Sequence, residues 1–273
     1  MVRRLGLVLV VLGALAVVPV ALSAYPTPLA QQGGEGVLSN DGTLRYVATA
    51  AAEGTLVSAR SASDGSLVRS QTVTGSFGIP TLTYKGPGGG MFRDGSAFML
   101  QSIGYNPTTS FQVLATADLA PRAAFTLKGT FAFDALSPDG TKLYLIQHTS
   151  SDDLQHYVVR LYDLSARRLM PGKIADKTQK GWVMQGFPAS RATSNDGRWA
   201  YTLYWNPGGF PFVHALDTVR GVAHCVGFAA PRNPAAVLDY TIRVQGQKLV
   251  IRTRAGVLYR VIDRGTWRVS KTL

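Results

Sequence analysis

The stretch Ser137-Pro138-Asp139-Gly140, followed at once by the apolar run 142–146, decides the fold because the chain repeats it. Related phrases that end in Asp-Gly and lead into apolar runs occur at three other places: Ser39-Asn40-Asp41-Gly42, Arg93-Asp94-Gly95 and Ser194-Asn195-Asp196-Gly197. Glycine supplies the positive φ that a tight hairpin needs, and the aspartate side chain caps the turn backbone. We therefore expect these aspartates to build turns between strands and not to act as catalytic acids.

A second pair of strands follows each Asp-Gly turn. A short apolar run ends at an Asp or Ser anchor, and an apolar residue returns soon after it; the anchors are Ser61, Asp118, Asp163, Asp217 and Asp263. Alternating apolar residues with turn residues at both ends are typical of a strand, a turn and a second strand. The fifth unit lacks Asp-Gly, but Gln245-Gly246 stands in its place. The chain is therefore interpreted as five units of four strands each.

The spacing of the units predicts their arrangement in space. The glycines at 42, 95, 140 and 197 are 53, 45 and 57 residues apart, which is the repeat length of propeller blades. We expect an all-β fold, a five-bladed β-propeller of four-stranded antiparallel blades that occupies residues 37–273. The blades are expected near residues 37–75, 89–128, 132–171, 187–228 and 235–273. Closure of the ring through residues 29–36, or by packing of the fifth blade on the first, stays open.

One unit carries a family resemblance. The stretch Leu136-Ser137-Pro138-Asp139-Gly140-Thr141-Lys142-Leu143-Tyr144-Leu145 resembles the blade signature of YVTN-type and related bacterial propellers, in which an S-P-D-G turn leads into a strand with an aromatic residue. Residues 38–47 and 193–202 are looser copies with Asn in the Pro position, and the absence of a Trp-Asp dipeptide makes intracellular WD40-like scaffolds a poorer match. The resemblance implies the fold of single blades only, because that superfamily includes binding modules, lactonases and envelope factors.

The N-terminal residues 1–24 have the features of a signal peptide. Arg3 and Arg4 form a basic start, residues 5–20 are apolar, and Ala21 and Ser23 suit a cut after Ser23. The alternative is an uncleaved anchor, because about 20 apolar residues can span a bilayer; the membrane would then be reached only through this segment. In both cases we expect residues 25–36 to be a tail and the remainder to be secreted or extracytoplasmic, in the cell envelope.

The charge balance is strongly basic. There are 28 Lys and Arg residues against 16 Asp and Glu, which gives a formal net charge of +12. Such a field attracts polyanions, and outside the cell these would be anionic envelope polymers or lipid head groups and not nucleic acid. Cys225 is the only cysteine, so no intramolecular disulfide can form, and its apolar neighbours predict a buried, inert thiol. We expect a monomer with an extracellular ligand of unknown identity, which a polyanion would suit.

Candidate ligand-binding residues lie in loops that do not repeat. Tyr105-Asn106-Pro107 and Trp205-Asn206-Pro207 occupy matching places in the second and fourth blades. Tyr105 and Trp205 would form aromatic platforms, with Asn106 and Asn206 as neighbouring amides; the alternative is that Asn-Pro only starts a turn. The long connection 172–187 carries three further candidates for an anion or sugar site: Lys177, Lys180 and Trp182. The alternative for this connection is a solvated linker without regular structure.

One loop carries side chains with metal-ligand chemistry: His148, Asp152, Asp153 and His156. A hairpin would bring the two histidines near each other with the carboxylates at its tip, and nitrogen and oxygen ligands suit zinc or a similar divalent metal. The spacing matches no defined motif, and solvated polar loop residues are the alternative. His214 and His224 lie in strand-like runs and are interpreted as packing residues. No other cofactor is expected.

The catalytic motifs of common enzyme classes are missing from the sequence. A glycosidase needs a pair of carboxyl groups, but Glu35 and Glu53 are the only glutamates and most aspartates are assigned to turns. There is no G-x-S-x-G, H-E-x-x-H or phosphate-binding loop. The leading hypothesis is a secreted, non-enzymatic propeller that binds a glycan, an anionic envelope polymer or a protein at the loop face opposite the Asp-Gly turns. The alternative is a metal-dependent hydrolase or lyase that uses the His/Asp loop.

Overall fold

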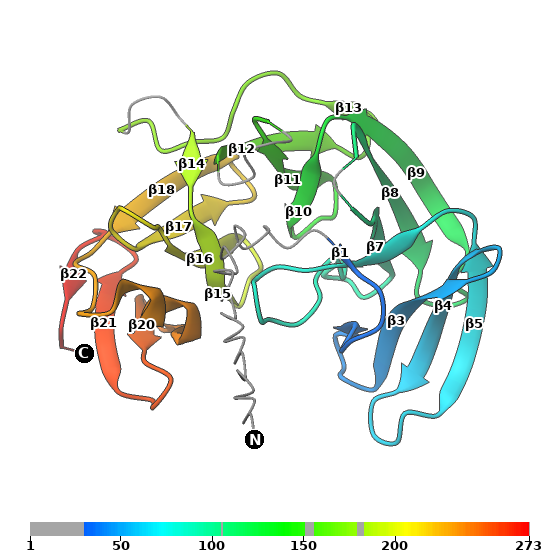
Figure 1. Cartoon of the computed structure of the whole chain (residues 1–273), viewed down its shortest axis with the longest axis horizontal. Coiled ribbons are helices and arrows are strands. Elements are labelled where there is room, and N and C mark those ends of the chain that lie inside the picture. Colours follow the sequence, from blue (N-terminus) through cyan, green and yellow to red (C-terminus); the bar gives the residue numbers. More distant parts are fainter. Residues whose placement is uncertain (1–29, 105, 151–155, 179–182, 273) are drawn as a thin grey trace, which may run out of the picture.

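Five antiparallel β-sheets follow one another along the chain and around an arc (Figure 1). The computed structural model describes residues 30–104, 106–150, 156–178 and 183–272. Besides the strands, these residues include one short 3-10 helix, η1 (Pro234–Asp239). None of the described helical residues forms a segment long and apolar enough to cross a membrane.

Each sheet corresponds to one predicted blade. Blade 1 contains β2 (Val37–Leu38), β3 (Leu44–Ala51), β4 (Gly54–Ser61) and β5 (Leu67–Val73). Blade 2 contains β6 (Phe77–Pro80), β7 (Ala97–Ser102), β8 (Thr108–Ala115) and β9 (Pro121–Lys128), with β1 (Ala30–Gln31) added to β6. Blade 3 contains β10 (Phe131–Leu136), β11 (Lys142–His148), β12 (His156–Asp163), β13 (Arg168–Leu169) and β14 (Met184–Gln185). Blade 4 contains β15 (Phe187–Thr193), β16 (Trp199–Trp205), β17 (Phe212–Asp217) and β18 (Val222–Gly227). Blade 5 contains β19 (Thr241–Gln245), β20 (Lys248–Arg252), β21 (Leu258–Asp263) and β22 (Val269–Ser270).

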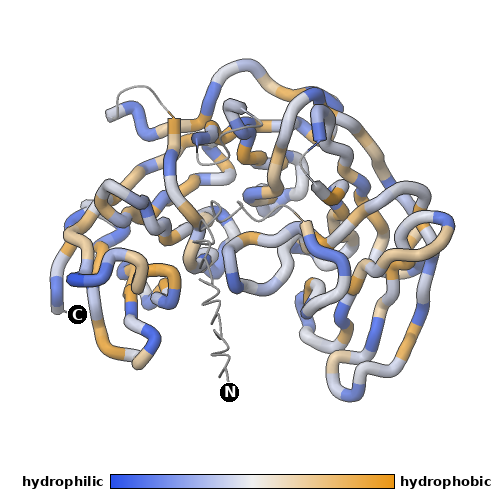
Figure 2. Tube along the Cα trace, in the orientation of Figure 1, coloured by the Kyte–Doolittle hydropathy of each residue, from blue (hydrophilic) through white to orange (hydrophobic). Residues whose placement is uncertain are grey.

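Apolar packing joins each blade to the next one along the chain. One hydrophobic cluster lies between each of the blade pairs 1 and 2, 2 and 3, 3 and 4, and 4 and 5. The apolar residues gather along the strands, whereas the turns are more polar (Figure 2). Among the described residues, no hydrophobic cluster joins blade 5 to blade 1, and the two lie on separate arms of the arc (Figure 1). The predicted units correspond to five successive antiparallel sheets, three of four strands and two of five, but the described blades form an open arc and not a closed ring.

The first strand of blade 2 is divided, which corrects its expected start near residue 89. Phe77 and Gly78 pair with Ser102 and Gln101 of β7, and the chain then leaves the sheet at Thr81. The chain rejoins the sheet at Gly90, whose carbonyl accepts a hydrogen bond from the Met99 N–H of β7, 3.0 Å away. Only the returning part adjoins the Asp-Gly turn, so sequence analysis found that part and missed β6.

The outer edge of blade 3 corrects a second expectation. The alternative of a linker without regular structure for residues 172–187 is wrong in part, because β14 pairs with His156 and Tyr157 of β12. Ile174 forms a bridge with Val159 of the same strand. The outer strand of this blade is therefore built from separate short pieces, none of which is long enough to show a strand pattern in the sequence.

The Asp-Gly turns have the structure that their sequence predicts. Gly42, Gly95, Gly140 and Gly197 all have φ between 69° and 75°, the left-handed region that glycine favours. The aspartate before each glycine accepts a hydrogen bond from the backbone N–H two residues later, at 2.9 to 3.1 Å. Hydrogen bonds from Ser137 and from the backbone and side chain of Thr141 outweigh the small effect of burial and lower the pKa of Asp139. These carboxylates are therefore ionised turn builders, as predicted.

The serine of the turn stabilises the strand that follows it. The Ser137 hydroxyl donates to Asp139 and accepts from the Lys142 N–H, 2.9 Å away, and Ser137 is only 3% exposed. We expect Ser137→Ala to lower the free energy of unfolding by about 1–2 kcal/mol, because two hydrogen bonds of a buried hydroxyl are lost. Ser39→Ala removes the same bonds at a more exposed turn and should cost less than half as much. Urea unfolding measures both variants, and equal losses would contradict the role of burial.

Candidate functional site

A long loop from blade 2 crosses the inside of the arc and contacts the opposite arm. Residues 81–92, called the inner loop, join β6 to the returning part of its strand. The Tyr84 N–H donates to the Pro188 carbonyl of β15 at 3.0 Å. Lys85 forms an ion pair with Asp239 of η1 at 2.9 Å. Figure 1 shows this loop reaching from β7 toward β15. The inner loop therefore links the second blade to the fourth and fifth blades across the centre.

Three hollows border the inner loop. The first, called the central cavity, has a volume of about 580 Å³ and lies against β10, β15 and residues 88–91. A second cavity of about 600 Å³ lies between the inner loop, β15 and η1. A third, of about 320 Å³, lies beside β1 and residues 33–36. The inner loop thus fills the centre of the arc only in part, and the space that remains is open to a ligand.

A buried ion pair lies in the wall of the central cavity. The Arg191 Nη1 atom of β15 is 2.6 Å from the Asp134 Oδ1 atom of β10, and the two side chains are 11% and 3% exposed. Arg191 also borders the second cavity. A charge in such a place needs its partner, because desolvation of a single buried ion costs several kcal/mol. The pair therefore fixes a guanidinium group between the two largest hollows.

A second arginine lies at the rim of the central cavity. Arg93 is exposed, and its Nη2 atom donates to the Asn195 carbonyl at 2.6 Å. Its own carbonyl accepts a hydrogen bond of 2.7 Å from the Asn40 side chain. Arg93 of blade 2 is thus held by a turn of blade 4 and by a turn of blade 1. The sequence contains one signal for this residue: Arg93 is a charged residue at the place that Asn40, Pro138 and Asn195 occupy in the other turns.

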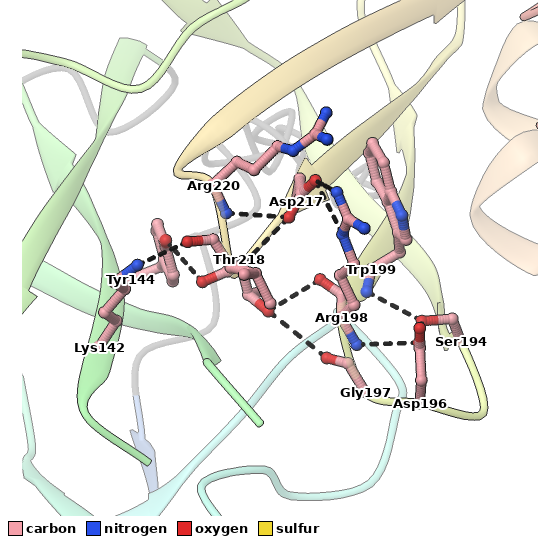
Figure 3. A network of polar contacts seen from close by, with 11 residues as sticks. Lys142, Tyr144, Ser194, Asp196, Gly197, Arg198, Trp199, Asp217, Thr218 and Arg220 are labelled. Atoms are coloured by element: carbon pink, nitrogen blue, oxygen red, sulfur yellow. Dashed lines mark hydrogen bonds and ion pairs between the residues drawn. The ribbon is translucent and has the colours of Figure 1, made fainter. Parts of the chain in front are cut away.

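A polar network stabilises the turns beside this rim (Figure 3). Arg198 binds Asp217 through Nε at 3.0 Å and Nη2 at 2.5 Å, and the buried Asp217 also accepts the N–H groups of Val219 and Arg220. The Tyr144 hydroxyl of blade 3 donates to the Thr218 carbonyl of blade 4 at 2.8 Å. Thr218 itself borders the central cavity. The anchor Asp217 is therefore a turn builder, as its sequence position predicts, and it supports one wall of the cavity.

The central cavity does not lie at the non-repeating loops that the sequence predicts as the binding face. Residues of all four Asp-Gly turns line it: Asn40, Arg93, Ser137, Pro138 and Gly197. The central cavity is therefore on the side of the repeating turns, whereas ligand binding was expected at the loops on the opposite face. Asp134, Arg191 and the inner loop carry no sequence motif, and only the glycine-rich run 86–90 marks this region in the sequence.

The two Asn-Pro loops lie in matching hairpins with blade 3 between them. Asn106 is exposed, and its side chain donates to the Ile103 carbonyl at 3.0 Å; Tyr105 lies outside the described residues. Trp205 is half-buried and stacks on Phe187, with ring centroids 5.4 Å apart. The Asn206 carbonyl accepts the Gly209 N–H at 3.1 Å, so Asn206 starts a turn. Each of these described contacts serves its own hairpin.

The candidates in the connection 172–187 are described only in part. Lys177 is exposed, whereas Lys180 and Trp182 lie outside the described residues. Asp176, next to Lys177, is buried and accepts the Cys225 N–H of β18 at 2.8 Å. This contact fixes the start of the connection on blade 4, and it places Lys177 at the surface.

The two histidines of the predicted metal loop lie on opposite faces of blade 3. His148 pairs with Tyr157 in the β11–β12 register, and side chains of paired residues share a face. His156 is the neighbour of Tyr157 along the strand, so it points to the other face. Asp152 and Asp153 lie outside the described residues. Within the described part of the chain, no three His, Cys, Asp or Glu side chains gather where they could hold a metal ion.

The single cysteine is close to a histidine, but neither group is in a reactive state. The Cys225 Sγ atom is 3.5 Å from His214 Nδ1. Burial, and to a smaller extent the nearby Asp176 carboxylate, raises the pKa of the Cys225 thiol to about 12. Burial lowers the pKa of His214 to about 4. The pair is therefore a neutral thiol beside a neutral imidazole near pH 7, whereas a catalytic pair needs a thiolate.

Comparison with known proteins supports the fold alone. No protein-family model matches the chain, and no curated protein matches its sequence. The chain is similar to the Dos1 propeller, with 11% identity over 86% of this chain and 57% of that one and a TM-score of 0.50. It is similar to the beta-propeller domain of Cps50 (Swd1) from Myceliophteria thermophila, with 10% identity over 87% and 67% and a TM-score of 0.50.

A third similar structure is the dihydro-heme d1 dehydrogenase NirN in complex with DHE. It is 12% identical over 90% of this chain and 47% of that one, with a TM-score of 0.50. The chain thus spans about half to two thirds of the length of these three chains. Identities this low carry no information about activity, but two of the three printed names are propellers. The chain is therefore an all-β protein with a β-propeller architecture.

Proposed function

We propose that this chain is an extracytoplasmic binding protein that holds an anionic group of its ligand in the central cavity and catalyses no reaction. The observation that carries this proposal is the placement of two guanidinium groups, those of Arg93 and Arg191, on one cavity of about 580 Å³. Asp134 neutralises Arg191, so the wall of the cavity keeps a net positive charge. A carboxylate or phosphate group is the chemistry that such a wall recognises.

Arg93 has the geometry of a ligand-binding residue. A guanidinium group has five N–H donors in a planar fork, and within the described residues Arg93 uses one of them, on the Asn195 carbonyl. That bond holds the side chain, and the Asn40 contact holds the Arg93 backbone, before a ligand arrives. A group that is already held in place loses little conformational entropy on binding, which favours affinity. Arg93 is therefore the residue whose loss should weaken binding most.

The acidic and nucleophilic side chains support a binding role. The aspartates of the Asp-Gly turns are ionised and occupied by backbone N–H groups, so they do not donate protons as general acids. Cys225 and His214 are held in their unreactive forms.

The proposed compartment rests on sequence, namely Arg3, Arg4 and the apolar run 5–20. An intact mass that begins at Ala24, measured on protein from the cell envelope, would support export, whereas an uncleaved cytoplasmic protein would contradict it.

Calorimetry with citrate and with pyrophosphate, one a carboxylate and one a phosphate probe, tests the proposal. We expect the full chain to bind at least one of them saturably, and we expect Arg93→Ala to weaken that binding about tenfold, as loss of one charge-assisted contact does. Lys128→Ala, which removes one exposed positive charge from β9, is the matched control and should change binding less than twofold. Equal effects of the two variants, or no binding of either probe, would refute the proposal.

A further inference from the structure

The two ends of the arc expose sheet faces that pack on no other described blade. In blade 1, Tyr46, Ala48, Val57 and Ala59 face blade 2 in one hydrophobic cluster. Alternation along a strand places their neighbours on the opposite face, where the register pairs Arg45 with Arg60, Val47 with Ser58 and Thr49 with Leu56. This outward surface is called the first end face. It carries two arginines where the inner face carries apolar side chains.

Blade 5 has an outward face of similar character. Ile242, Leu249, Ile251 and Ile262 pack toward blade 4. The opposite surface, called the second end face, carries residues that the register sets beside one another: Thr241, Arg243, Lys248, Val250, Arg252, Leu258, Val261 and Asp263. Three of these residues are basic and one is acidic. Because Asp263 is paired with Lys248 in the register, Arg243 and Arg252 carry the excess positive charge of this face.

The charges of the first end face lack an acidic partner. Arg45 and Arg60 lie directly opposite each other on neighbouring strands, and like charges in this arrangement destabilise a sheet. Their guanidinium groups donate to the carbonyls of Glu35 and Gly65, and within the described part of the chain neither one forms an ion pair with a carboxylate. The acidic side chains of blade 1 lie in its turns, at Asp41, Glu53 and Asp64.

We propose that the open side of the arc, between the first and second end faces, docks a partner protein with an acidic surface. Both end faces carry a net positive charge, so an acidic partner is attracted by both arms at once. Val47, Ser58, Val250 and Val261 of the two faces are buried, whereas Arg60, Arg243 and Lys248 are exposed, so each face presents mainly charged side chains. The docking is therefore governed by charge and by the shape of two sheet faces, and it is independent of the central cavity.

The same charges argue against a second copy of the chain as the occupant. Closure of the arc by another copy would bring one basic end face against another, which costs free energy. The two end faces also repel each other, so they do not draw the arc shut. A partner that carries carboxylates offsets the repulsion between the two end faces. It also offsets the repulsion between the neighbouring side chains of Arg45 and Arg60.

Binding of a fluorescent poly-L-glutamate peptide to the full chain tests the proposal, with fluorescence anisotropy as the measurement. We expect the double variant Arg45→Glu/Arg60→Glu to weaken binding about tenfold, and Arg243→Glu/Arg252→Glu to do the same, since each pair reverses two charges on one face. The control Arg122→Glu/Lys128→Glu makes the same change in charge on the outer strand β9 and should change binding less than threefold.

Several outcomes would overturn the docking proposal. Equal weakening by all three charge reversals would mean that only the total charge matters. If the unmodified chain did not bind poly-L-glutamate, the proposal of an acidic partner would be wrong. Tighter binding of polyphosphate through the same arginines would assign the end faces to a phosphate polymer. A dimer in light scattering that Arg45→Glu/Arg60→Glu dissociates would assign them to a second copy. Failure here leaves the proposed function untouched, because binding in the central cavity is measured separately with citrate and pyrophosphate.

Discussion

Replacement of Asp134 by alanine is expected to lower the free energy of unfolding by about 3–5 kcal/mol, because it leaves Arg191 buried without a counter-charge. The pair is 2.6 Å apart and the Arg191 side chain is only 11% exposed, so water solvates the remaining charge poorly. Urea unfolding followed by circular dichroism measures the effect. The double variant Asp134→Leu/Arg191→Met replaces the pair by apolar groups of similar size and should recover most of the loss.

An exposed ion pair elsewhere in the same molecule provides the control for this prediction. Lys85 and Asp239 also form a single contact, but their side chains are 62% and 37% exposed. Exposed pairs contribute about 0–1 kcal/mol, so Asp239→Ala should have a small effect. If Asp134→Ala and Asp239→Ala proved equally mild, the cavity would have to solvate Arg191 freely, and the ion pair would not organise its wall.

Asp217→Ala is expected to cost about 2–4 kcal/mol, since it removes four hydrogen bonds from a fully buried carboxylate. Unfolding by urea at pH 7 provides the measurement. Asp163→Ala is the control, because Asp163 holds the corresponding place in blade 3 and caps only the Ala166 N–H. The control should cost about 1 kcal/mol or less. Equal costs at the two positions would mean that Arg198 adds nothing to the turn.

The effect of Asp217 should depend on pH in a defined direction. Burial opposes its ionisation, but the hydrogen bonds from Arg198, Arg220 and Val219 outweigh burial and hold its pKa below the ordinary value of 3.8. The unfolded chain then takes up the proton first, so this stabilisation is present above the unfolded pKa and is lost as the pH falls through the folded pKa. The difference between the unmodified chain and Asp217→Asn should shrink as the pH falls below about 4.

The turns and the strands of the blades could be predicted because they depend on residues close together in the sequence. Asp139 contacts Ser137 and Thr141, both two residues away, so the five residues 137–141 contain all the contacts of the turn. The strands after the turns show the same locality, since apolar alternation reports which face is buried. Blade 2 shows where this approach fails: an inner loop inserted between Pro80 and Gly90 separated β6 from its own turn.

The candidate site could not be found in the same way. Arg93 and Arg191 are 98 residues apart, and no motif links either one to Asp134. Tyr105, Asp152, Asp153, Lys180 and Trp182 stay predictions, because they lie outside the described residues. The loops that looked distinctive serve their own hairpins at Asn106, Trp205 and Asn206. The predicted binding residues were chosen from the composition of single loops. The cavity, in contrast, depends on which blades face one another in the folded chain.

What this sequence determined by itself was the local unit: four strands, their turns, and the number of times the unit repeats. Each of those features rests on contacts that span a few residues, and glycine φ angles and side-chain caps encode such contacts directly. Only the tertiary structure decided that the described blades form an open arc, that the inner loop crosses it, and that two basic end faces pack on no other described blade. These features rest on contacts such as Lys85 with Asp239, 154 residues apart, and their strength depends on how the intervening blades pack.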